Sequence, residues 1–201
     1  MSEAKHLGGV KLILASASPR RAELLREHGY EFSVFQPPLP EPSYEHLAPA
    51  QLAEALSFFK ASSVAEHLDQ GWVLGADTVA ALGEEVFGKP ADRRDAERIL
   101  RALAGTTHEV ITGVTLLDAA SDRRLMRHDV TAVAMRALSD AQLTAYLDSN
   151  EWAGKAGAYG IQDRGDEFVS RIEGSFTNVV GLPMELLADM LRSFRTSTFE
   201  P

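Results

Sequence analysis

The sequence contains no cysteine, which excludes disulfide bonds and thiolate chemistry. It has no apolar run near the roughly 20 residues that a membrane-spanning helix needs. The first nine residues have no apolar core of the length found in secretory signals. These absences predict a cytoplasmic protein that has no membrane as a partner.

Basic residues are also scarce, since 20 Lys and Arg stand against 29 Asp and Glu, for a formal net charge of −9. Binding to a nucleic-acid polymer normally requires a basic face, so such a partner is not expected. The histidines lack the i, i+4 spacing of helical zinc ligands, and no G-x-x-x-x-G-K-[ST] motif is present. A local basic pocket for a small polyanion fits this composition better.

The hydrophobic pattern alternates between short strands and amphipathic helices, which predicts an α/β fold without a linker. With 201 residues and 45% hydrophobic content, the chain can form one large domain or two closely joined lobes. Strands are predicted over 12–15, 30–35, 71–82, 108–118, 125–136, 167–172 and 176–180. Helices are predicted over 19–28, 49–68, 92–103 and 139–147, and again after Pro183. The four prolines within 37–42 predict a rigid extended loop.

The segment LILASASPRRAELL, residues 12–25, places a buried strand, a polar turn and a helix start in succession. Ser18 suits the N-cap and Pro19 the first helical position, so the first amides of the helix would face an anion. Arg20 and Arg21 can each bind an oxyanion through two N–H groups. An ordinary strand-to-helix connection with two solvated arginines remains the alternative.

Asp77 is the strongest candidate for chemistry, because it interrupts a strongly apolar segment. A charge near the end of a buried strand needs a metal or a lysine as partner. The alternative is an aspartate that caps a turn. Lys89 is held between Gly88 and Pro90, and Glu41 lies in the proline-rich loop, where a rigid backbone could support a metal ligand.

Residues 155–162, KAGAYGIQ, combine small residues with a phenol and an amide. The small residues would let a ligand approach the backbone, and Tyr159 and Gln162 could hydrogen-bond a base or a phosphate. A plain glycine-rich loop is the alternative. His108 is interpreted as a structural or surface histidine, because no serine and aspartate pattern accompanies it.

Taken in order, six segments resemble the Maf nucleotide pyrophosphatases of the inosine-triphosphatase-like superfamily. They span nearly the whole chain, and the ordered set is far more specific than any one of them. The segments are LILASASPRRAELL (12–25), VLGADTVAAL (73–82), FGKP (87–90), LAGTTHEVITGV (103–114), KAGAYGIQ (155–162) and EGSFTNVVGLP (173–183).

The resemblance implies a mixed, twisted sheet flanked by helices, with two lobes around a cleft. It implies one Maf-like domain over residues 1–201 and a homodimer. The termini at 1–9 and 196–201 are expected to be flexible. The implied reaction is hydrolysis of a nucleoside triphosphate to the monophosphate and pyrophosphate with Mg²⁺, or Mn²⁺, as cofactor.

The same resemblance implies a role for each matching residue. The phosphate-binding residues are Ser16, Ser18, Arg20 and Arg21. The catalytic residues are Asp77, Glu41, Lys60 and Lys89, of which Glu41 and Asp77 are also the metal ligands. Lys155 and Gln162 are the remaining substrate-binding residues that the resemblance implies, and Tyr159 is added to them from the interpretation of residues 155–162.

The GADT and KAGAYGIQ strings are similar to the family branch that acts on dTTP and UTP, and modified pyrimidine nucleotides could be further substrates. A 7-methyl-GTP pyrophosphatase is the alternative within the family. Departures from the family pattern occur at Pro40, at 57–59 and at Asp163. Two other classes stay open: a nucleotide-binding regulator of cell division without turnover, and a phosphomonoesterase that releases orthophosphate.

Overall fold

The computed structural model describes residues 7, 9–44, 46–121, 123–162 and 167–196. Its centre is a mixed seven-stranded sheet in the order β2-β1-β3-β5-β6-β7, with β4 paired to β3 outside this path. The strands are β1 Leu12–Ala15, β2 Ser33–Val34, β3 Trp72–Leu82, β4 Glu85–Phe87, β5 Thr107–Asp118, β6 Arg124–Met135 and β7 Val169–Glu173. The helices are α1 Pro19–Glu27, α2 Pro49–Ala65, α3 Arg93–Leu103, α4 Asp140–Ser149, α5 Phe176–Val180 and α6 Met184–Thr196, with a 3₁₀ turn at Ala156–Ala158.

The predicted mixed α/β fold is therefore confirmed. Strand β1 runs parallel to β2 and β3, whereas β3, β5, β6 and β7 pair antiparallel to one another. The parallel pairing of β1 with β3 stops at Ala15 and Gly75, although β3 continues to Leu82. The sheet therefore loses a neighbour on this side of β3 directly beyond Gly75, where Asp77 follows.

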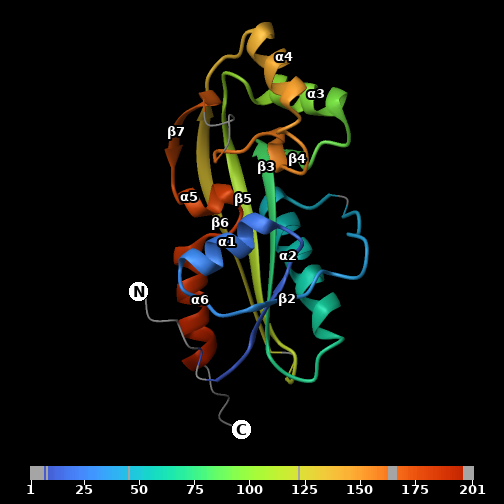
Figure 1. Cartoon of the computed structure of the whole chain (residues 1–201), viewed down its shortest axis with the longest axis vertical. Coiled ribbons are helices and arrows are strands. Elements are labelled where there is room, and N and C mark those ends of the chain that lie inside the picture. The colour runs from blue at the N-terminus through green and yellow to red at the C-terminus, as the bar shows by residue number, and fades with distance from the viewer. Residues whose placement is uncertain (1–6, 8, 45, 122, 163–166, 197–201) are drawn as a thin grey trace.

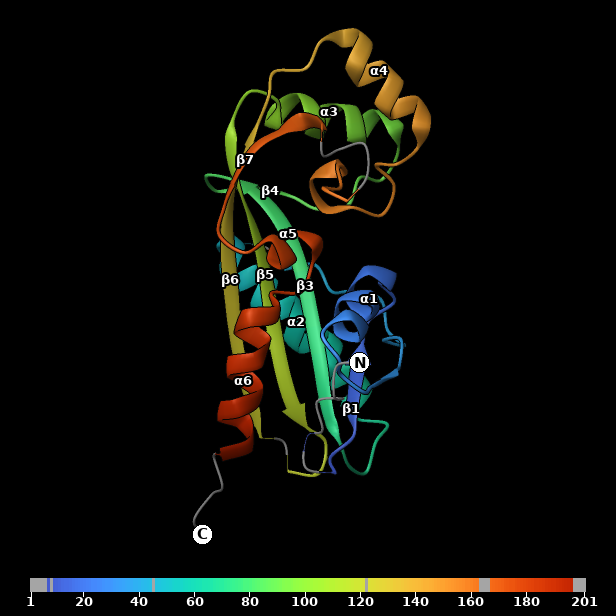
Figure 2. The same ribbon diagram turned by 60° about the vertical axis from the view of Figure 1, so that its left-hand side comes forward.

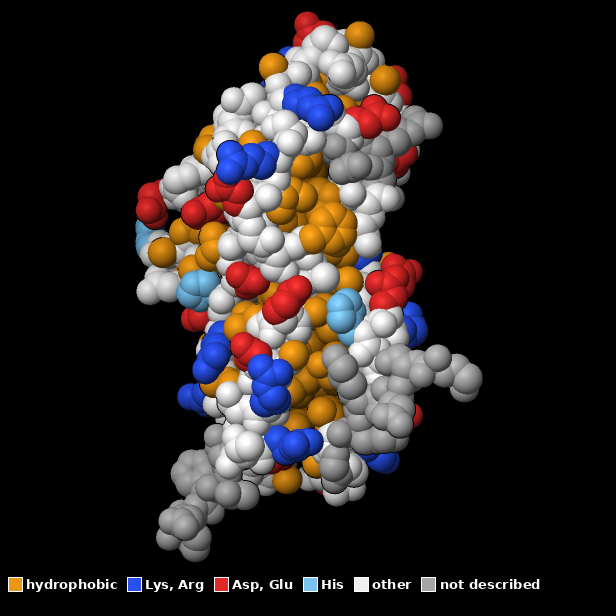
Figure 3. Space-filling model, turned by 90° about the vertical axis from the view of Figure 1, so that its left-hand side faces the viewer, with side chains coloured by type: hydrophobic (Ala, Val, Ile, Leu, Met, Phe, Trp, Pro, Cys, Tyr) orange, Lys and Arg blue, Asp and Glu red, His pale blue; other side chains and the backbone are white. Residues whose placement is uncertain are grey.

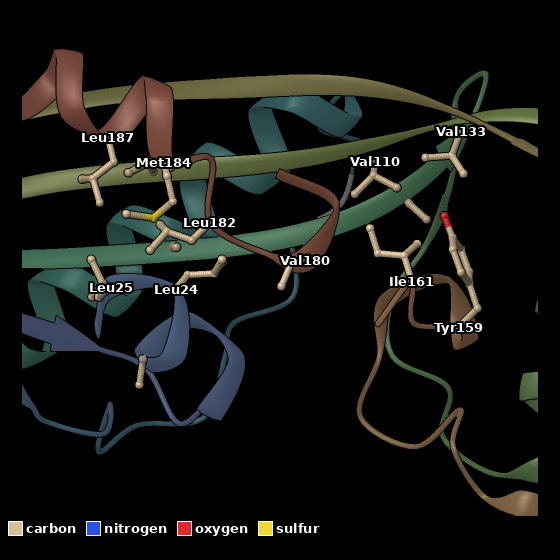
Figure 4. Close-up of a cluster of buried hydrophobic side chains, with 14 of the residues drawn as sticks. Leu24, Leu25, Val110, Val133, Tyr159, Ile161, Val180, Leu182, Met184 and Leu187 are labelled. Carbon is tan, nitrogen blue, oxygen red and sulfur yellow. The ribbon is translucent and has the colours of Figure 1, made fainter. Parts of the chain in front are cut away.

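Helices cover both faces of the sheet, because alternate strand residues point to opposite sides. Leu12 and Leu14 belong to the main core with α1 and α6, whereas Ile13 and Ala15 belong to a second cluster with α2. Figure 1 shows α1 and α6 on one side of the long strands and α2 on the other. Figure 4 shows the junction of α1 with α6 within the main core.

Two glycines set the close approach of α2 to the sheet. A Cβ atom built on Gly75 would lie 2.1 Å from the carbonyl oxygen of Ser57, and one on Gly113 would lie 2.2 Å from that of Ala53. Both separations are far below contact distance, so a side chain would push α2 away. Gly75 and Gly113 therefore allow α2, and with it Lys60, to lie directly on the sheet at β3 and β5.

The two ends of the long strands carry different helices. Figure 2 shows α3 and α4 packed at one end of β3, β5 and β6, and α1, α2 and α6 at the other. The expected two-lobed arrangement of the fold is thus present, and the same strands run through both lobes. No described helix is both long and apolar enough to cross a membrane.

One predicted strand is wrong, since Phe176–Val180 forms helix α5. The β-branched residues Thr177, Val179 and Val180 favour a strand by propensity. Ser175 overrides that preference, because its Oγ atom accepts the amide of Asn178 as an N-cap. Gly181 then ends the helix with φ of 128°.

Other boundaries differ less. The strand predicted over 30–35 is reduced to Ser33–Val34, and the helix predicted over 49–68 ends at Ala65. The predicted flexible termini, 1–9 and 196–201, lie almost wholly outside the described residues, so this remains a prediction.

Candidate active-site cleft

A cleft of about 1020 Å³ opens between the two lobes beside β3. Its walls come from the loop after β1, α1, the proline-rich loop, α2, β3, the segment around Lys89, β5, the loop at 153–162 and α5. All of the site residues expected from the sequence line it: Ser16, Ser18, Arg20, Arg21, Glu41, Lys60, Asp77, Lys89, Lys155, Tyr159 and Gln162. The fold therefore brings together positions as far apart in the sequence as Ser16 and Gln162.

The loop after β1 has the geometry of an anion site. Ser18 is the N-cap of α1 with an extended backbone, and Pro19 follows at the first helical position. The Ser18 side chain makes no capping bond, and its backbone amide donates to Oγ of Ser16 at 3.1 Å. The first-turn amides are therefore not capped by Ser18, and the half-buried Arg20 lies beside them.

Arg21 has a different environment from Arg20. It is buried, and its Nε atom donates to the carbonyl oxygen of Gly181 at 2.8 Å. Its other nitrogens donate to Oγ of Ser16 at 3.2 Å and Oγ1 of Thr78 at 3.0 Å. Burial lowers the pKa of Arg21, and the nearby carboxylate of Asp77 opposes that effect. The sequence predicted that the N–H groups of Arg21 bind phosphate. In the structure they instead donate to protein acceptors and hold the cleft wall together.

An ion-pair cluster occupies the centre of the cleft. The Nζ atom of Lys60 donates to Oδ1 of Asp77 and lies 3.0 Å from Oε1 of Glu41. Lys60 and Asp77 are buried, whereas the side chain of Glu41 is 45% exposed. Partial burial opposes ionisation of Glu41, but Lys60, Lys89 and Arg21 outweigh it and lower the pKa of this carboxyl group. Both carboxylates thus meet at one cation.

The side chains of Asp77 and Thr78 show how β3 supplies both walls. Consecutive strand residues point to opposite faces, so Asp77 meets Lys60 on the α2 face and Thr78 meets Arg21 on the α1 face. Of the two kinds of partner expected for Asp77, a metal or a lysine, the structure shows a lysine, and Asp77 lies within β3 and not at a turn.

The two carboxylates suit a divalent cation that also binds the substrate. No cluster of three or more His, Cys, Asp and Glu side chains within the described ranges could form a metal cage by itself. Mg²⁺ commonly uses one or two carboxylates and completes its shell with waters and substrate phosphates. Glu41 and Asp77 approach the same Lys60 ammonium, so their oxygens are close enough to fit that pattern.

The opposite wall carries Lys89 and Lys155. Lys89 is exposed and Lys155 is half-buried, and both line the cleft. The segments that hold them are joined, because the amide of Gly157 donates to the carbonyl oxygen of Gly88 at 3.2 Å. Gly157 has φ of 71°, and a Cβ atom there would lie 3.1 Å from the side chains of Ala80 and Tyr159.

Tyr159 and Gln162 differ in what they offer a ligand. Tyr159 is buried, and its hydroxyl lies 2.7 Å from Nε2 of His108. Burial raises the pKa of Tyr159 above its usual range, so the phenol stays protonated. Gln162 is exposed in the cleft, where its amide can reach a ligand. His108 is buried, as expected of a structural histidine.

Sequence reasoning gave no role to Thr78 or Asn178. Oγ1 of Thr78 lies 2.9 Å from that of Thr112, and Thr112 donates to the carbonyl oxygen of Asn178 at 3.1 Å. Nδ2 of Asn178 donates to the carbonyl oxygen of Val110 and to Thr131, both at 2.9 Å. A buried polar chain therefore joins Arg21 to α5. The FTNVVGLP string contained the signal, because a buried asparagine needs specific partners.

Comparison with known proteins extends these findings. A family model described as Maf-like protein matches residues 11–194. A dTTP/UTP pyrophosphatase of Pelotomaculum thermopropionicum is 44% identical over 184 residues, covering 92% of this chain and 96% of that protein. A second one, of Acetivibrio thermocellus, is 41% identical over 198 residues, which are 95% and 98% of the two chains. A third, of Geobacter sulfurreducens, is 44% identical and covers 90% and 96%.

Proposed function

The chain belongs to the Maf family, and from that premise we propose that it hydrolyses dTTP and UTP to the nucleoside monophosphate and pyrophosphate. The relatives named dTTP/UTP pyrophosphatase match over nearly their whole length, which supports the same reaction here. The observation that carries the proposal is the Glu41–Lys60–Asp77 cluster, placed in one cleft with the helix start at Arg20 and the lysines at 89 and 155.

The cations of the cleft suit a triphosphate. Arg20 and the first amides of α1 can hold phosphate oxygens, and Lys89 approaches from the other lobe. The same groups stabilise the negative charge that grows on the leaving pyrophosphate. Arg21 contributes by fixing Ser16 and the Gly181 turn around that site.

Asp77 is the group that we assign to the attacking water. Its Oδ1 atom accepts from Lys60, so Oδ2 is the oxygen available to take a proton from water. The water oxygen then bonds to the α-phosphorus, and the bond from this phosphorus to the bridging oxygen breaks. That oxygen keeps the electron pair and leaves as part of pyrophosphate.

A divalent cation completes the proposed site. Glu41 and Asp77 would hold Mg²⁺, or Mn²⁺ in its place, which would offset phosphate charge and polarise the phosphoryl oxygens. Lys60 would then move away from the two carboxylates or share them with the ion.

The nucleotide base would lie at the end of the cleft nearer to α3 and α4, beyond the Glu41–Lys60–Asp77 cluster. The lining there is apolar and comes from three elements and the 153–162 loop: Ala80, Val110, Ile161 and Val180. Figure 4 shows Val110, Ile161 and Val180 around one space, with Tyr159 beside them. The exposed amide of Gln162 supplies a donor and an acceptor for a pyrimidine edge.

We also propose a homodimer in the cytoplasm, where nucleoside triphosphates are abundant. Figure 3 shows apolar side chains gathered along the face of β6, β7, α5 and α6. Val130 and Phe176, on these elements, are 40% and 50% exposed. Such a face is suited to self-association. Sedimentation equilibrium should give twice the chain mass, and a monomer at micromolar concentration would exclude this part of the proposal.

A substrate screen tests the proposed reaction. The purified protein is incubated with each nucleoside triphosphate and Mg²⁺, and pyrophosphate and orthophosphate are assayed separately. Pyrophosphate from dTTP and UTP is expected. Orthophosphate as the product would favour a phosphomonoesterase, preference for 7-methyl-GTP would favour the other family branch, and tight binding without turnover would favour a regulator.

A further inference from the structure

His108 lies next to the cleft without lining it. The side chain is 1% exposed and comes from β5, and within the described part of the chain only its Nε2 atom has a hydrogen-bond partner. That partner is the hydroxyl of Tyr159, 51 residues later, at 2.7 Å. The two rings pack edge to face, with centroids 5.5 Å apart. Nε2 of His108 and the hydroxyl of Tyr159 thus satisfy each other, whereas the buried Nδ1 atom of His108 has no hydrogen-bond partner among the described residues.

The backbone before Tyr159 is held in an unfavourable conformation. Gly157 has φ of 71°, and Ala158, which has a Cβ atom and is fully buried, has φ of 60°. A left-handed alanine costs free energy, so its surroundings must fix it. One fixed point is the bond from the Gly157 amide to the Gly88 carbonyl oxygen. The other is Tyr159, whose hydroxyl Figure 4 shows directed at the strands that carry Val110 and Val133.

We propose that His108 is a positioning residue for substrate selectivity, which it exerts by anchoring Tyr159 and thereby fixing the base-facing wall at 160–162. This inference rests on the proposed function, because it assumes that the wall contacts the pyrimidine. Gly160, Ile161 and Gln162 follow Tyr159 directly and all line the cleft. A shift of the tyrosine ring therefore moves the groups that contact the base.

The chemistry of the pair excludes a role for His108 as a phosphate cation. Burial lowers the pKa of His108 to about 4, so the imidazole is neutral near pH 7. Its one partner is a phenol that stays protonated, and the imidazole lines no part of the cleft. What remains is a neutral hydrogen bond, which is directional and therefore suited to holding a ring in place.

The test compares His108→Phe, Tyr159→Phe and the double variant. Each single change removes the hydrogen bond and keeps an aromatic ring, so kcat/KM for UTP relative to GTP should fall about 3- to 10-fold, as expected for one lost bond. The double variant should fall no further, because the bond is already absent in each single one. His108→Gln, whose amide can still reach the phenol, should recover part of the ratio.

A matched control separates positioning from general stability. Thr115→Val removes a buried side-chain hydrogen bond of similar length, 2.8 Å to Oγ of Ser57, at a residue that does not line the cleft. It should leave the UTP to GTP ratio within twofold of the wild type. Equal ratios in wild type, Tyr159→Phe and His108→Phe would overturn the inference, as would an equal loss in Thr115→Val.

Binding of α,β-methylene analogues of UTP and GTP gives a readout without turnover. The ratio of the two dissociation constants should change in His108→Phe and Tyr159→Phe by the same 3- to 10-fold, and an unchanged ratio would overturn the inference. If His108→Phe fails to fold, Tyr159→Phe and His108→Gln decide the outcome alone. If the wild type binds both analogues but hydrolyses neither nucleotide, the proposed function is wrong. The ratio of dissociation constants then tests the inference by itself.

Discussion

The Nζ atom of Lys60 donates to Oδ1 of Asp77 at the centre of the cleft, and the two side chains are 7% and 9% exposed. Removing one partner of such a pair leaves the other buried charge uncompensated, which is strongly destabilising. The pair exists because Gly75 lets α2 approach β3 and because Asp77 faces α2. The two residues must therefore be tested with changes that keep the packing.

Asp77→Asn is expected to reduce kcat about 10²-fold or more. The amide keeps the side-chain volume and can still accept from Lys60, but it can neither take a proton from water nor hold a divalent cation as a carboxylate does. Steady-state kinetics with UTP and Mg²⁺ measure the effect, and circular dichroism checks the fold. Wild-type kcat in the folded variant would show that Asp77 is not the general base of the reaction.

Arg20 and Arg21 are adjacent and chemically identical but lie in different environments, so the same substitution at each position should have different effects. Arg20→Ala should raise KM and lower kcat with little change in thermal midpoint, since Arg20 is half-buried at the cleft and acts on phosphate.

Arg21→Ala should instead lower the stability by about 3 kcal/mol, because it removes three hydrogen bonds of a buried side chain, to the Gly181 carbonyl oxygen, Oγ of Ser16 and Oγ1 of Thr78. Thermal melting and kinetics on both variants separate the two cases. Equal midpoints for Arg20→Ala and Arg21→Ala would contradict the assigned roles.

His108 should make stability depend on pH. Its pKa is about 4 in the folded protein and 6.5 in the unfolded chain, where burial is lost. Between these values only the unfolded chain binds the proton, so the stabilisation is complete above pH 6.5 and is lost as the pH falls to 4. The loss is on the order of 3 kcal/mol.

Urea unfolding at pH 7 and pH 4 measures this contribution. The wild type should lose more stability than His108→Phe by roughly that amount, whereas Tyr159→Phe should resemble the wild type because the imidazole stays buried. Equal losses of stability between pH 7 and pH 4 in the wild type and His108→Phe would show that protonation of His108 is not the cause.

Gln162→Ala is expected to reduce the preference for UTP over purine triphosphates. A lost hydrogen bond to the base is worth about 0.5–1.5 kcal/mol, which is a change of about 2- to 13-fold in the ratio of kcat/KM values. Gln162 is exposed, so the fold should not be affected. If the ratio across bases stays constant, selectivity depends on other residues of the cleft.

Much of the fold could be predicted because local signals agreed with the tertiary structure. The helices predicted over 92–103 and 139–147 form α3 and α4, because Asp92 caps α3 by accepting the amide of Asp95 and Ser139 caps α4 by accepting that of Gln142. The apolar segment around Asp77 is a central strand. Helix α5 was missed because its short β-branched sequence favours a strand, and only the Ser175 cap and the packing decide otherwise.

The sequence predicted which residues line the cleft but not what each of them does there. The motifs and the family resemblance together supplied every predicted residue that lines the cleft, including Glu41 and Lys60 outside the six quoted segments. Adjacent identical residues such as Arg20 and Arg21, however, look the same in a sequence. Burial and the partners Gly181 and Thr78 distinguish them, and those partners lie 160 and 57 residues away. The same holds for His108, whose contact with Tyr159 spans 51 residues. Long-range pairings of this kind carry no local signal.

Hydrolysis of UTP in ¹⁸O-labelled water tests the central claim most directly, since Asp77 is proposed to direct water at the α-phosphorus. After a single turnover, mass spectrometry should find the label in UMP and none in pyrophosphate, with no UDP at any time point. Label in pyrophosphate would place the attack at the β-phosphorus. UDP with labelled orthophosphate would place it at the γ-phosphorus, and either result would contradict this account.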